Sequence, residues 1–201
     1  MKNIILAGVG GQGIVLASRL IAQSAMQKGL QVRTAETIGM AQRGGCVVSH
    51  VRLGDNLHSP LIPLQKADVI IGFEPAEAVR CLPYLKENGT VIVSKKAIKP
   101  VTASLSDSGY DGQEMLDYLR RYVTQLIVID GQAICAACGS DKVLNIALLG
   151  ASVASGVLDI SMAEMEESIK ATLPKKFVTI NLKALNGGGS ASTLNIIKEQ
   201  V

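Results

Sequence analysis

A stretch near the start of the chain constrains its fold most. An apolar run at residues 3–7 leads directly into Gly8-Val9-Gly10-Gly11-Gln12-Gly13. Four glycines in six residues force a turn in which the backbone can come close to a ligand or to another chain. Residues 14–28 then place apolar side chains at helical spacing. The sequence therefore predicts a strand, a glycine loop and a helix whose N-terminal N–H groups would suit an anion.

The same loop also fits a dinucleotide-binding pattern. Its spacing, Gly8-x-Gly10-x-x-Gly13, is that of the fingerprint found in NAD and FAD proteins. A second strand is predicted at residues 30–35. Glu36, at its end, stands about where a ribose-binding carboxylate would. Taken alone, these residues predict a stand-alone dinucleotide-binding module. The fingerprint is a weak pattern, and the residues after Glu36 favour another interpretation.

A second glycine-rich loop follows Glu36. Residues 37–45 have no helix or strand period, and they place Arg43 against Gly44 and Gly45. Because both glycine loops follow the carboxyl ends of strands predicted to be adjacent, we expect a binding site at this edge of the sheet. Arg43 could hold a phosphate or carboxylate through its bidentate fork, with Glu36 orienting it. A solvated loop cation is the alternative interpretation of Arg43.

The rest of the chain predicts an α/β fold. Short apolar strands alternate with amphipathic helices up to residue 130, which requires a parallel sheet with helices on both faces. The strand at residues 46–53 is predicted to belong to a β-ribbon off the main sheet. After Gly131 the chain is mostly helical, and we expect a last helix at residues 175–185, stopped by Gly187, Gly188 and Gly189. A helix is predicted at residues 162–173, with Ser161 as its N-cap residue. Glu164 follows Ser161 by three residues, which is the pattern of a capping box.

These elements define a fold class and a domain organisation. The prediction is a three-layer α/β/α fold with a mostly parallel, Rossmann-like sheet, a β-ribbon excursion and a helical C-terminal third. At 201 residues the chain is long enough for one well-buried domain and short for two. We assign residues 1–189 to that domain and residues 190–201 to a C-terminal tail.

Composition excludes several classes of function. The net charge of +3 is small and spread out, and aromatic residues make up 3% of the chain, so neither nucleic acid nor an anionic membrane is an expected partner. Only 18% of residues are charged, which suggests that part of the surface lies against another subunit. No signal peptide is visible, and the uncharged run at residues 143–158 is predicted to be a buried helix. We therefore expect a soluble, cytoplasmic protein.

Other reactive residues do not form a catalytic or metal-binding pattern. Cys135 and Cys138 have no second cysteine pair nearby, so they are interpreted as small thiols, with a redox dithiol or a metal site as alternatives. The two histidines, His50 and His58, are too few for a metal triad, and no catalytic triad is assigned. Glu74 and Glu77 flank the start of a helix, where a structural role is expected.

Several motifs together resemble one protein family. They are Gly8-x-Gly10-Gly11-Gln12-Gly13, Arg43-Gly44-Gly45, Ala67-Asp68, Glu74-Pro75-x-Glu77-Ala78, Asn145-x-x-Leu148-Leu149-Gly150, Leu149-Gly150-Ala151 and the stretch from Pro174-Lys175-Lys176 to Asn181. In this combination the chain resembles, nearly end to end, the gamma-type subunit of 2-oxoacid:ferredoxin oxidoreductases. Indolepyruvate oxidoreductase small subunits share the signature, so the resemblance does not specify whether the 2-oxoacid is pyruvate, a branched-chain acid or indolepyruvate.

The resemblance implies a non-catalytic subunit of an oxidative decarboxylase. Thiamine diphosphate, iron–sulfur clusters and CoA belong to the complex, with ferredoxin or flavodoxin as electron acceptor, and none is bound by this chain alone. Its sequence carries neither a Gly-Asp-Gly thiamine motif nor a ferredoxin-type cysteine run. Thiamine-binding and ferredoxin-like subunits would supply those parts, and the glycine loops would face a partner subunit or CoA. The isolated chain could form a homodimer. A stand-alone NAD or FAD module and a regulatory scaffold are the alternatives.

Overall fold

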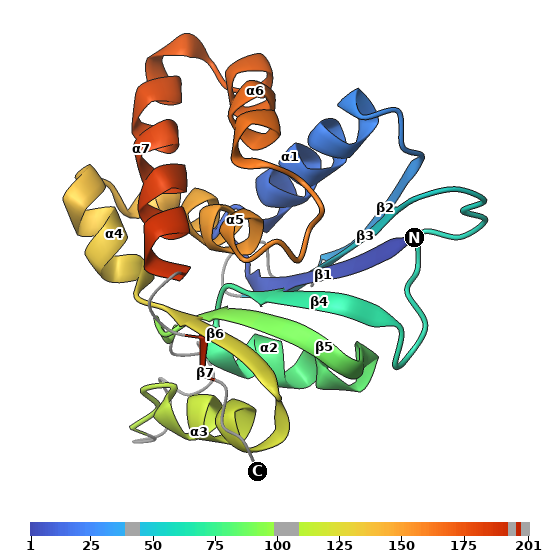
Figure 1. Ribbon diagram of the computed structural model, residues 1–201. Coiled ribbons are helices and arrows are strands. Elements are labelled where there is room, and N and C mark those ends of the chain that lie inside the picture. Colours follow the sequence, from blue (N-terminus) through green and yellow to red (C-terminus); the bar gives the residue numbers. More distant parts are fainter. Residues whose placement is uncertain (39–44, 99–108, 193–195, 198–201) are drawn as a thin grey trace.

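The computed structural model describes residues 1–38, 45–98, 109–192 and 196–197, and its strands form one sheet (Figure 1). The strand order is β2-β3-β1-β4-β5-β6-β7. β1, β4, β5 and β6 are neighbours in that order and pair in parallel. β3 pairs antiparallel with β1 and β2, and β7 pairs antiparallel with β6. The strands are β1 (Lys2–Val9), β2 (Val32–Ile38), β3 (Cys46–Leu53), β4 (Ala67–Gly72), β5 (Leu85–Ser94), β6 (Gln125–Ile129) and β7 (Ile196–Ile197).

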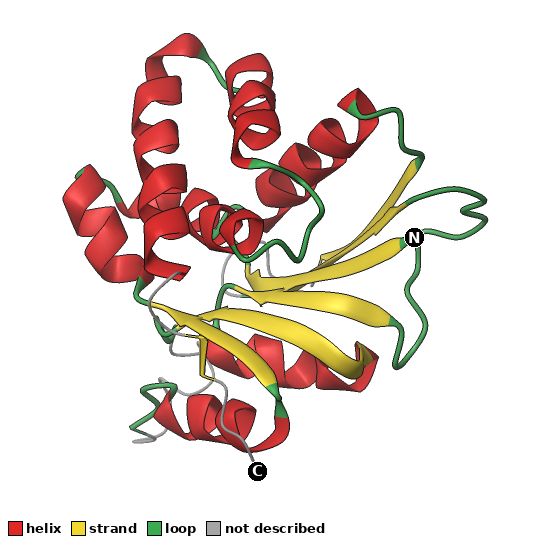
Figure 2. Cartoon of the chain, in the orientation of Figure 1, coloured by secondary structure: helices red, strands yellow, loops and turns green. Residues whose placement is uncertain are grey.

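Helices cover both faces of this sheet (Figure 2). α2 and α3 lie on one face, while α1 and the helices of the C-terminal third lie on the other. The predicted three-layer α/β/α architecture is therefore confirmed. No helix in the described ranges is long and apolar enough to cross a membrane. The helices are α1 (Ile14–Gln27), α2 (Pro75–Cys81), η1 (Leu82–Tyr84), α3 (Gln113–Tyr122), α4 (Gly131–Cys138), η3 (Asp141–Val143), α5 (Leu144–Ala154), α6 (Met162–Thr172) and α7 (Lys175–Ser192).

The position of β3 corrects the predicted β-ribbon. β3 lies inside the sheet, antiparallel to β1 on one side and to β2 on the other. The physical reason is that β3 has apolar groups to bury on both faces: Val47 and Val51 join the core under α1, and Val48 packs against the core under α2. A ribbon away from the sheet would leave one of these faces in water. β1 and β2 are consequently separated by one strand.

The end of α7 corrects a second prediction. Gly187, Gly188 and Gly189 do not stop the helix, which continues to Ser192. A Cβ on Gly188 would lie 1.9 Å from the carbonyl oxygen of Ala147, so the backbones of α5 and α7 are in direct contact there. Glycine costs a helix up to about 1 kcal/mol relative to alanine, and this close packing offsets the cost. The triple glycine is thus a packing surface and not a helix terminator.

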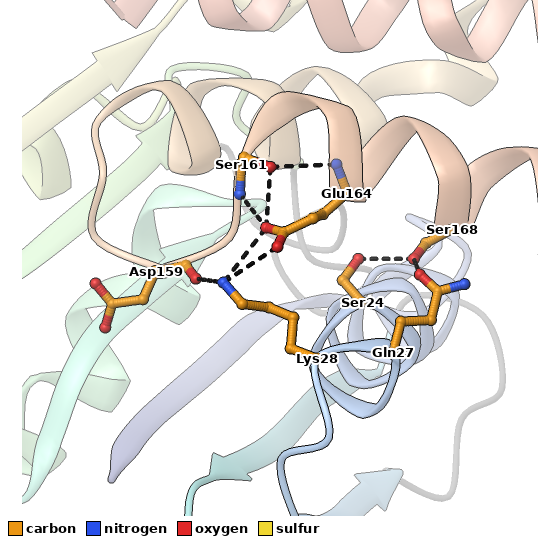
Figure 3. A network of polar contacts seen from close by, with 7 residues as sticks. All are labelled: Ser24, Gln27, Lys28, Asp159, Ser161, Glu164 and Ser168. Atoms are coloured by element: carbon orange, nitrogen blue, oxygen red, sulfur yellow. Dashed lines mark hydrogen bonds and ion pairs between the residues drawn. The ribbon is translucent and has the colours of Figure 1, made fainter.

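A polar network fixes α6 against α1, the helix that begins at the glycine loop (Figure 3). Lys28, just after α1, forms an ion pair with Glu164 at 3.3 Å. Glu164 also accepts a hydrogen bond from the Ser161 N–H at 2.7 Å, and the reciprocal contact completes the predicted capping box. The hydroxyl of Ser24 donates to Ser168 at 2.8 Å in a buried contact between the two helices. The C-terminal helices are in this way tied to the N-terminal strand-loop-helix unit.

His50 of β3 fixes the loop that follows the strand. Its ring is buried, and Nδ1 accepts a hydrogen bond from the Ile62 N–H at 3.2 Å. The ring also contacts Tyr84 edge to face, with 5.6 Å between ring centres. Burial lowers the pKa of His50 below its ordinary value of 6.5. The neutral imidazole is therefore the form that the fold requires, because protonation of Nδ1 would remove the acceptor.

Alanine substitutions of two glycines in α7 should distinguish the effect of close helix packing from that of helix propensity. We expect Gly188→Ala to lower the free energy of unfolding by about 1–3 kcal/mol, because its Cβ would overlap the backbone of α5. Gly187→Ala is the matched control: the nearest atom to its Cβ is the Ile134 Cγ2 at 3.1 Å, a side-chain end that can move. Its effect should lie within about 1 kcal/mol of zero. Equal effects in urea titrations of the two variants would contradict the packing role.

Acid should destabilise the protein through His50. The pKa is depressed in the folded state, so its contribution to stability is present above the unfolded value of 6.5 and is lost as the pH falls through the folded pKa. We expect urea unfolding measured from about pH 7.5 down to about pH 5 to show this loss. His50→Asn keeps an acceptor near the Nδ1 position and should flatten the dependence. His58→Asn, on an exposed histidine, should leave it unchanged.

Candidate functional site

The glycine loop after β1 is held by the side chain of Gln12. The Gln12 Oε1 accepts a hydrogen bond from the Val9 N–H at 2.7 Å, and its Nε2 donates to the Phe73 carbonyl at 2.9 Å. A Cβ on Gly8 would lie 2.6 Å from the Gln12 Oε1. Gly8 is therefore needed to make room for this amide. Gln12, predicted as a ligand-facing residue, connects the end of β1 to the end of β4 within the chain.

Gly13 shapes the start of α1. It is the N-cap residue with φ of 76°, the left-handed region that glycine adopts most easily. The Asn145 Nδ2 of α5 donates to its carbonyl oxygen at 3.2 Å. No side chain caps the helix, and no acidic residue lies in its first turn. The N–H groups of this turn and the positive end of the helix dipole thus suit an anion.

The two glycine loops meet at the carboxyl edge of the sheet. The Gly10 N–H donates to the Gly45 carbonyl at 2.8 Å. The strands before the loops are not adjacent as predicted, since β3 lies between them. β1 and β2 nevertheless run in the same direction, because each is antiparallel to β3, and so their carboxyl ends reach one edge. Arg43 and Gly44 lie outside the described residues.

A cavity of about 520 Å³ opens in front of the first glycine loop. Lys96, two residues after β5, and Lys142, in η3, both line it beside the N-terminus of α1. Asp141 lines it as well, so the charges are two cations and one anion. This donor set fits a phosphate or carboxylate group. The adjacent Lys95 differs, because its ammonium pairs with Asp130 at 2.5 Å.

The two lysines were not among the residues predicted from the sequence. A signal for Lys96 was present, since it comes two residues after a strand whose carboxyl end reaches the same sheet edge as the glycine loop. Lys142 had no such signal, because its position depends on how α5 packs against α1.

Glu36 lies away from this cavity. It is exposed on β2, and its carboxylate accepts a hydrogen bond from the Ser18 hydroxyl in the second turn of α1 at 3.3 Å. Because β3 separates β2 from β1, Glu36 stands about two strand spacings, or about 10 Å, from β1. In the dinucleotide-binding arrangement the ribose-binding acid is on the strand next to the glycine loop. The geometry therefore does not reproduce the NAD site suggested by the fingerprint.

The acids at the start of α2 have structural roles. Glu74 is the N-cap residue, and its side chain accepts a hydrogen bond from the Glu77 N–H at 3.1 Å. The Tyr110 hydroxyl donates to the same carboxylate. Glu77 is buried, and within the described ranges its Oε2 has no hydrogen-bond partner. Burial, together with the nearby Glu77 carboxylate, raises the pKa of the Cys46 thiol to about 11.

The remaining cysteine pair lies at the end of α4. Cys135 is buried and Cys138 is half-buried, and both are free thiols. Burial raises the pKa of Cys135 above its ordinary value. A thiol that resists ionisation is a poor nucleophile and a poor metal ligand. Among the described residues, no group of three or more histidines, cysteines or acids is placed to hold a metal ion.

Gly13→Ala should be more harmful than a simple turn substitution. Its Cβ would lie 2.6 Å from the Asn145 Nδ2, so the crowding comes from α5 and not from the strand. Gly11→Ala is the control: φ is 100°, but no atom lies within 4 Å of the added Cβ. Both should lose about 1–2 kcal/mol of folding free energy from backbone strain. Gly13→Ala should lose about 1–3 kcal/mol more.

A double-mutant cycle identifies the source of that extra loss. Combining Gly13→Ala with Asn145→Ala removes the crowding group, so the two substitutions should cost less together than the sum of their separate costs. Urea unfolding of the four proteins measures this coupling. Strict additivity would mean that the side chain of Asn145 does not cause the loss.

Comparison with known proteins agrees with the resemblance noted in the sequence. The chain is 40% identical over 187 residues to the Indolepyruvate oxidoreductase subunit IorB of Archaeoglobus fulgidus, covering 92% of each chain. It is 28% identical over 187 residues to the Pyruvate/ketoisovalerate oxidoreductases common subunit gamma of Thermococcus litoralis, covering 92% of this chain and 93% of that one. These relatives favour the interpretation as an oxidoreductase subunit over the stand-alone dinucleotide-binding module.

A solved structure shows the same fold. The keto/oxoacid ferredoxin oxidoreductase gamma subunit from Geobacter sulfurreducens matches with a TM-score of 0.70 and 23% identity, over 97% of this chain and 100% of that chain. The family model for pyruvate ferredoxin/flavodoxin oxidoreductase matches residues 3–191. The chain therefore belongs to the pyruvate ferredoxin/flavodoxin oxidoreductase family.

Proposed function

We propose that this chain is the small, non-catalytic subunit of a 2-oxoacid:ferredoxin or flavodoxin oxidoreductase. The reaction of the complex would be the CoA-dependent oxidative decarboxylation of pyruvate, a branched-chain 2-oxoacid or indolepyruvate. The observation that carries this proposal is the family match along nearly the whole chain. We assign residues 1–189 to a single gamma-type domain within that subunit and place the complex in the cytoplasm.

The cofactors and partners are part of the same proposal. Thiamine-binding and ferredoxin-like subunits would hold thiamine diphosphate and the iron–sulfur clusters, and ferredoxin or flavodoxin would accept the electrons. This assignment follows from the sequence, which has no Gly-Asp-Gly motif and no ferredoxin-type cysteine run. The role of this chain would then be to bind, orient and shield groups that react on its partners.

Within the subunit, the glycine face is the proposed contact with CoA phosphates or with a partner. The uncapped N-terminus of α1 and the two lysines of the 520 Å³ cavity supply positive charge at one place. Asp141 reduces the net charge, so a phosphate rather than a diffuse anionic surface suits the site. Arg43, beside Gly44 and Gly45 in the second loop, is the further cation that we assign to this face.

Reconstitution with the partner subunits tests the proposal. We expect Lys96→Ala and Lys142→Ala each to weaken CoA binding about tenfold, because each would remove a charge-assisted contact. Lys95→Ala is the matched control, since Lys95 pairs with Asp130 instead of lining the cavity. CoA titrations should be run alongside gel filtration, so that a loss of assembly is distinguished from a loss of CoA affinity. Unchanged CoA dependence and assembly in both variants would remove the site from the glycine face.

The isolated chain supplies a second arm of that experiment. Without the partner subunits it should give no turnover of any of the three 2-oxoacids with thiamine diphosphate, CoA and a viologen dye. It should also show no saturable binding of NAD in calorimetry. Turnover comparable to the complex, or micromolar NAD binding abolished by Gly13→Ala, would overturn the assignment as a non-catalytic subunit.

A further inference from the structure

The outer edge of β2 is an unprotected strand edge. β2 is the terminal strand of the sheet, and no strand in the described part of the chain pairs with its outer side. It pairs with β3 over seven consecutive residues without a bulge. It contains no proline, and Arg33 and Glu36 are its only charged residues. Natural sheets usually block such edges with prolines, bulges or dense charge, because a free edge recruits another strand.

A groove for side chains lies next to this edge. A concavity of about 320 Å³ is lined by Ser18, Arg19 and Ala22 of α1 and by residues 34–36 of β2. Added strands are recognised through main-chain hydrogen bonds at the edge and through pockets for alternate side chains beside it. β2 and α1 thus present both elements together. Most α1 side chains at this surface are buried. Arg19 and Met26 are exposed.

The charges in this groove are self-complementary. Arg19 is exposed and has no ion pair among the residues that the structure describes. Glu36, from the facing strand, is exposed and is held by the Ser18 hydroxyl on the α1 side of the sheet. One copy therefore offers one cation and one anion on the same surface. A second copy related by a two-fold axis would place each charge opposite its complement. The symmetry would then form the cation–anion contact twice, whereas an unrelated strand has no reason to match both charges.

We propose that the outer edge of β2 binds a second copy of this chain, whose own β2 pairs antiparallel to it and continues the sheet. The two-fold axis runs perpendicular to the sheet, so both copies keep the same face towards their α1 helices. Paired residue numbers must then have an even sum, since directly opposed side chains share a face. The pairing that places Ala35 opposite Ala35 of the second copy meets this condition and sets Thr34 opposite its Glu36.

Helix spacing and charge both fit this pairing. α1 packs mainly on β3, so the two α1 helices would stand three strand spacings apart, or about 14 Å. Packed helices usually stand about 8–10 Å apart, so the two α1 helices would not touch through their backbones. Long side chains that face each other, such as Arg19 and Met26, would roughly fill the remaining gap. Glu36 of each copy would lie on the same face of the continued sheet as Arg19 of the other copy. The two Glu36 side chains are offset along the strands and do not face each other. This contact uses the opposite flank of α1 from the glycine cavity and does not depend on the proposed function.

Charge reversal in the full-length chain tests the contact. Sedimentation velocity and light scattering over about 1–200 μM should show a monomer–dimer equilibrium for the wild-type chain. Arg19→Glu and Glu36→Arg should each weaken dimerisation about tenfold, because each would create like-charge contacts across the axis. The double variant, Arg19→Glu with Glu36→Arg, should restore the wild-type dissociation constant. Arg121→Glu, an equal charge change on exposed α3, is the control and should have no effect.

Hydrogen exchange supplies a second measurement. The outward-facing amides of β2 should become more protected as the protein concentration rises, while those of β6 should not change. Thermal unfolding confirms that each variant is folded. A monomer at the highest concentration, or a dimer insensitive to both single reversals, would overturn the proposal. Loss of dimer in the single variants without recovery in the double variant would overturn the Arg19–Glu36 pairing.

Discussion

The two hydrogen bonds of the Gln12 amide are the interaction on which the site depends. They join the end of β1 to the end of β4, and so they set the path of the chain between the first strand and α1. The amide fits only because Gly8 has no side chain. Gly13 then starts the helix in a left-handed conformation with Asn145 against it. The loop resembles a phosphate-binding loop, but internal hydrogen bonds set its path, and its outer surface lines the cavity.

The same loop explains why a dinucleotide fingerprint occurs without the corresponding geometry. Gly8 is required here by the Gln12 amide and Gly13 by the contact with α5, and both positions belong to the spacing of a nucleotide-binding loop. The antiparallel strand β3 then separates β1 from β2 and moves Glu36 to the far flank of α1. A local pattern of three glycines is thus compatible with two different sheet orders. The order of strands, and not the spacing, decides whether a ribose-binding acid can reach the loop.

Close backbone contact organises the helices of the C-terminal third, which share a face of the sheet with α1. Gly150 of α5 and Gly188 of α7 let the two helices approach until a Cβ on either would meet a carbonyl oxygen at about 2 Å. α5 in turn carries Asn145 to Gly13 and follows η3, which carries Lys142 to the cavity. The packing of the C-terminal helices therefore positions one wall of the candidate anion site. Stability and site geometry are linked through the same small residues.

The sequence alone determined the strand-loop-helix start, the alternation of strands and helices, the capping box of α6 and the family. Each depends on residues close together in the chain or on motifs read in order, such as Ser161 with Glu164. Tertiary structure decided the place of β3 inside the sheet, the continuation of α7 through three glycines and the presence of Lys96 and Lys142 beside the glycine loop. Those features depend on contacts between distant segments: β3 needed apolar partners on both faces, and Gly188 needed the backbone of α5 against it. Local propensity carries no information about such contacts, because the energy that settles them arises only when the segments pack together.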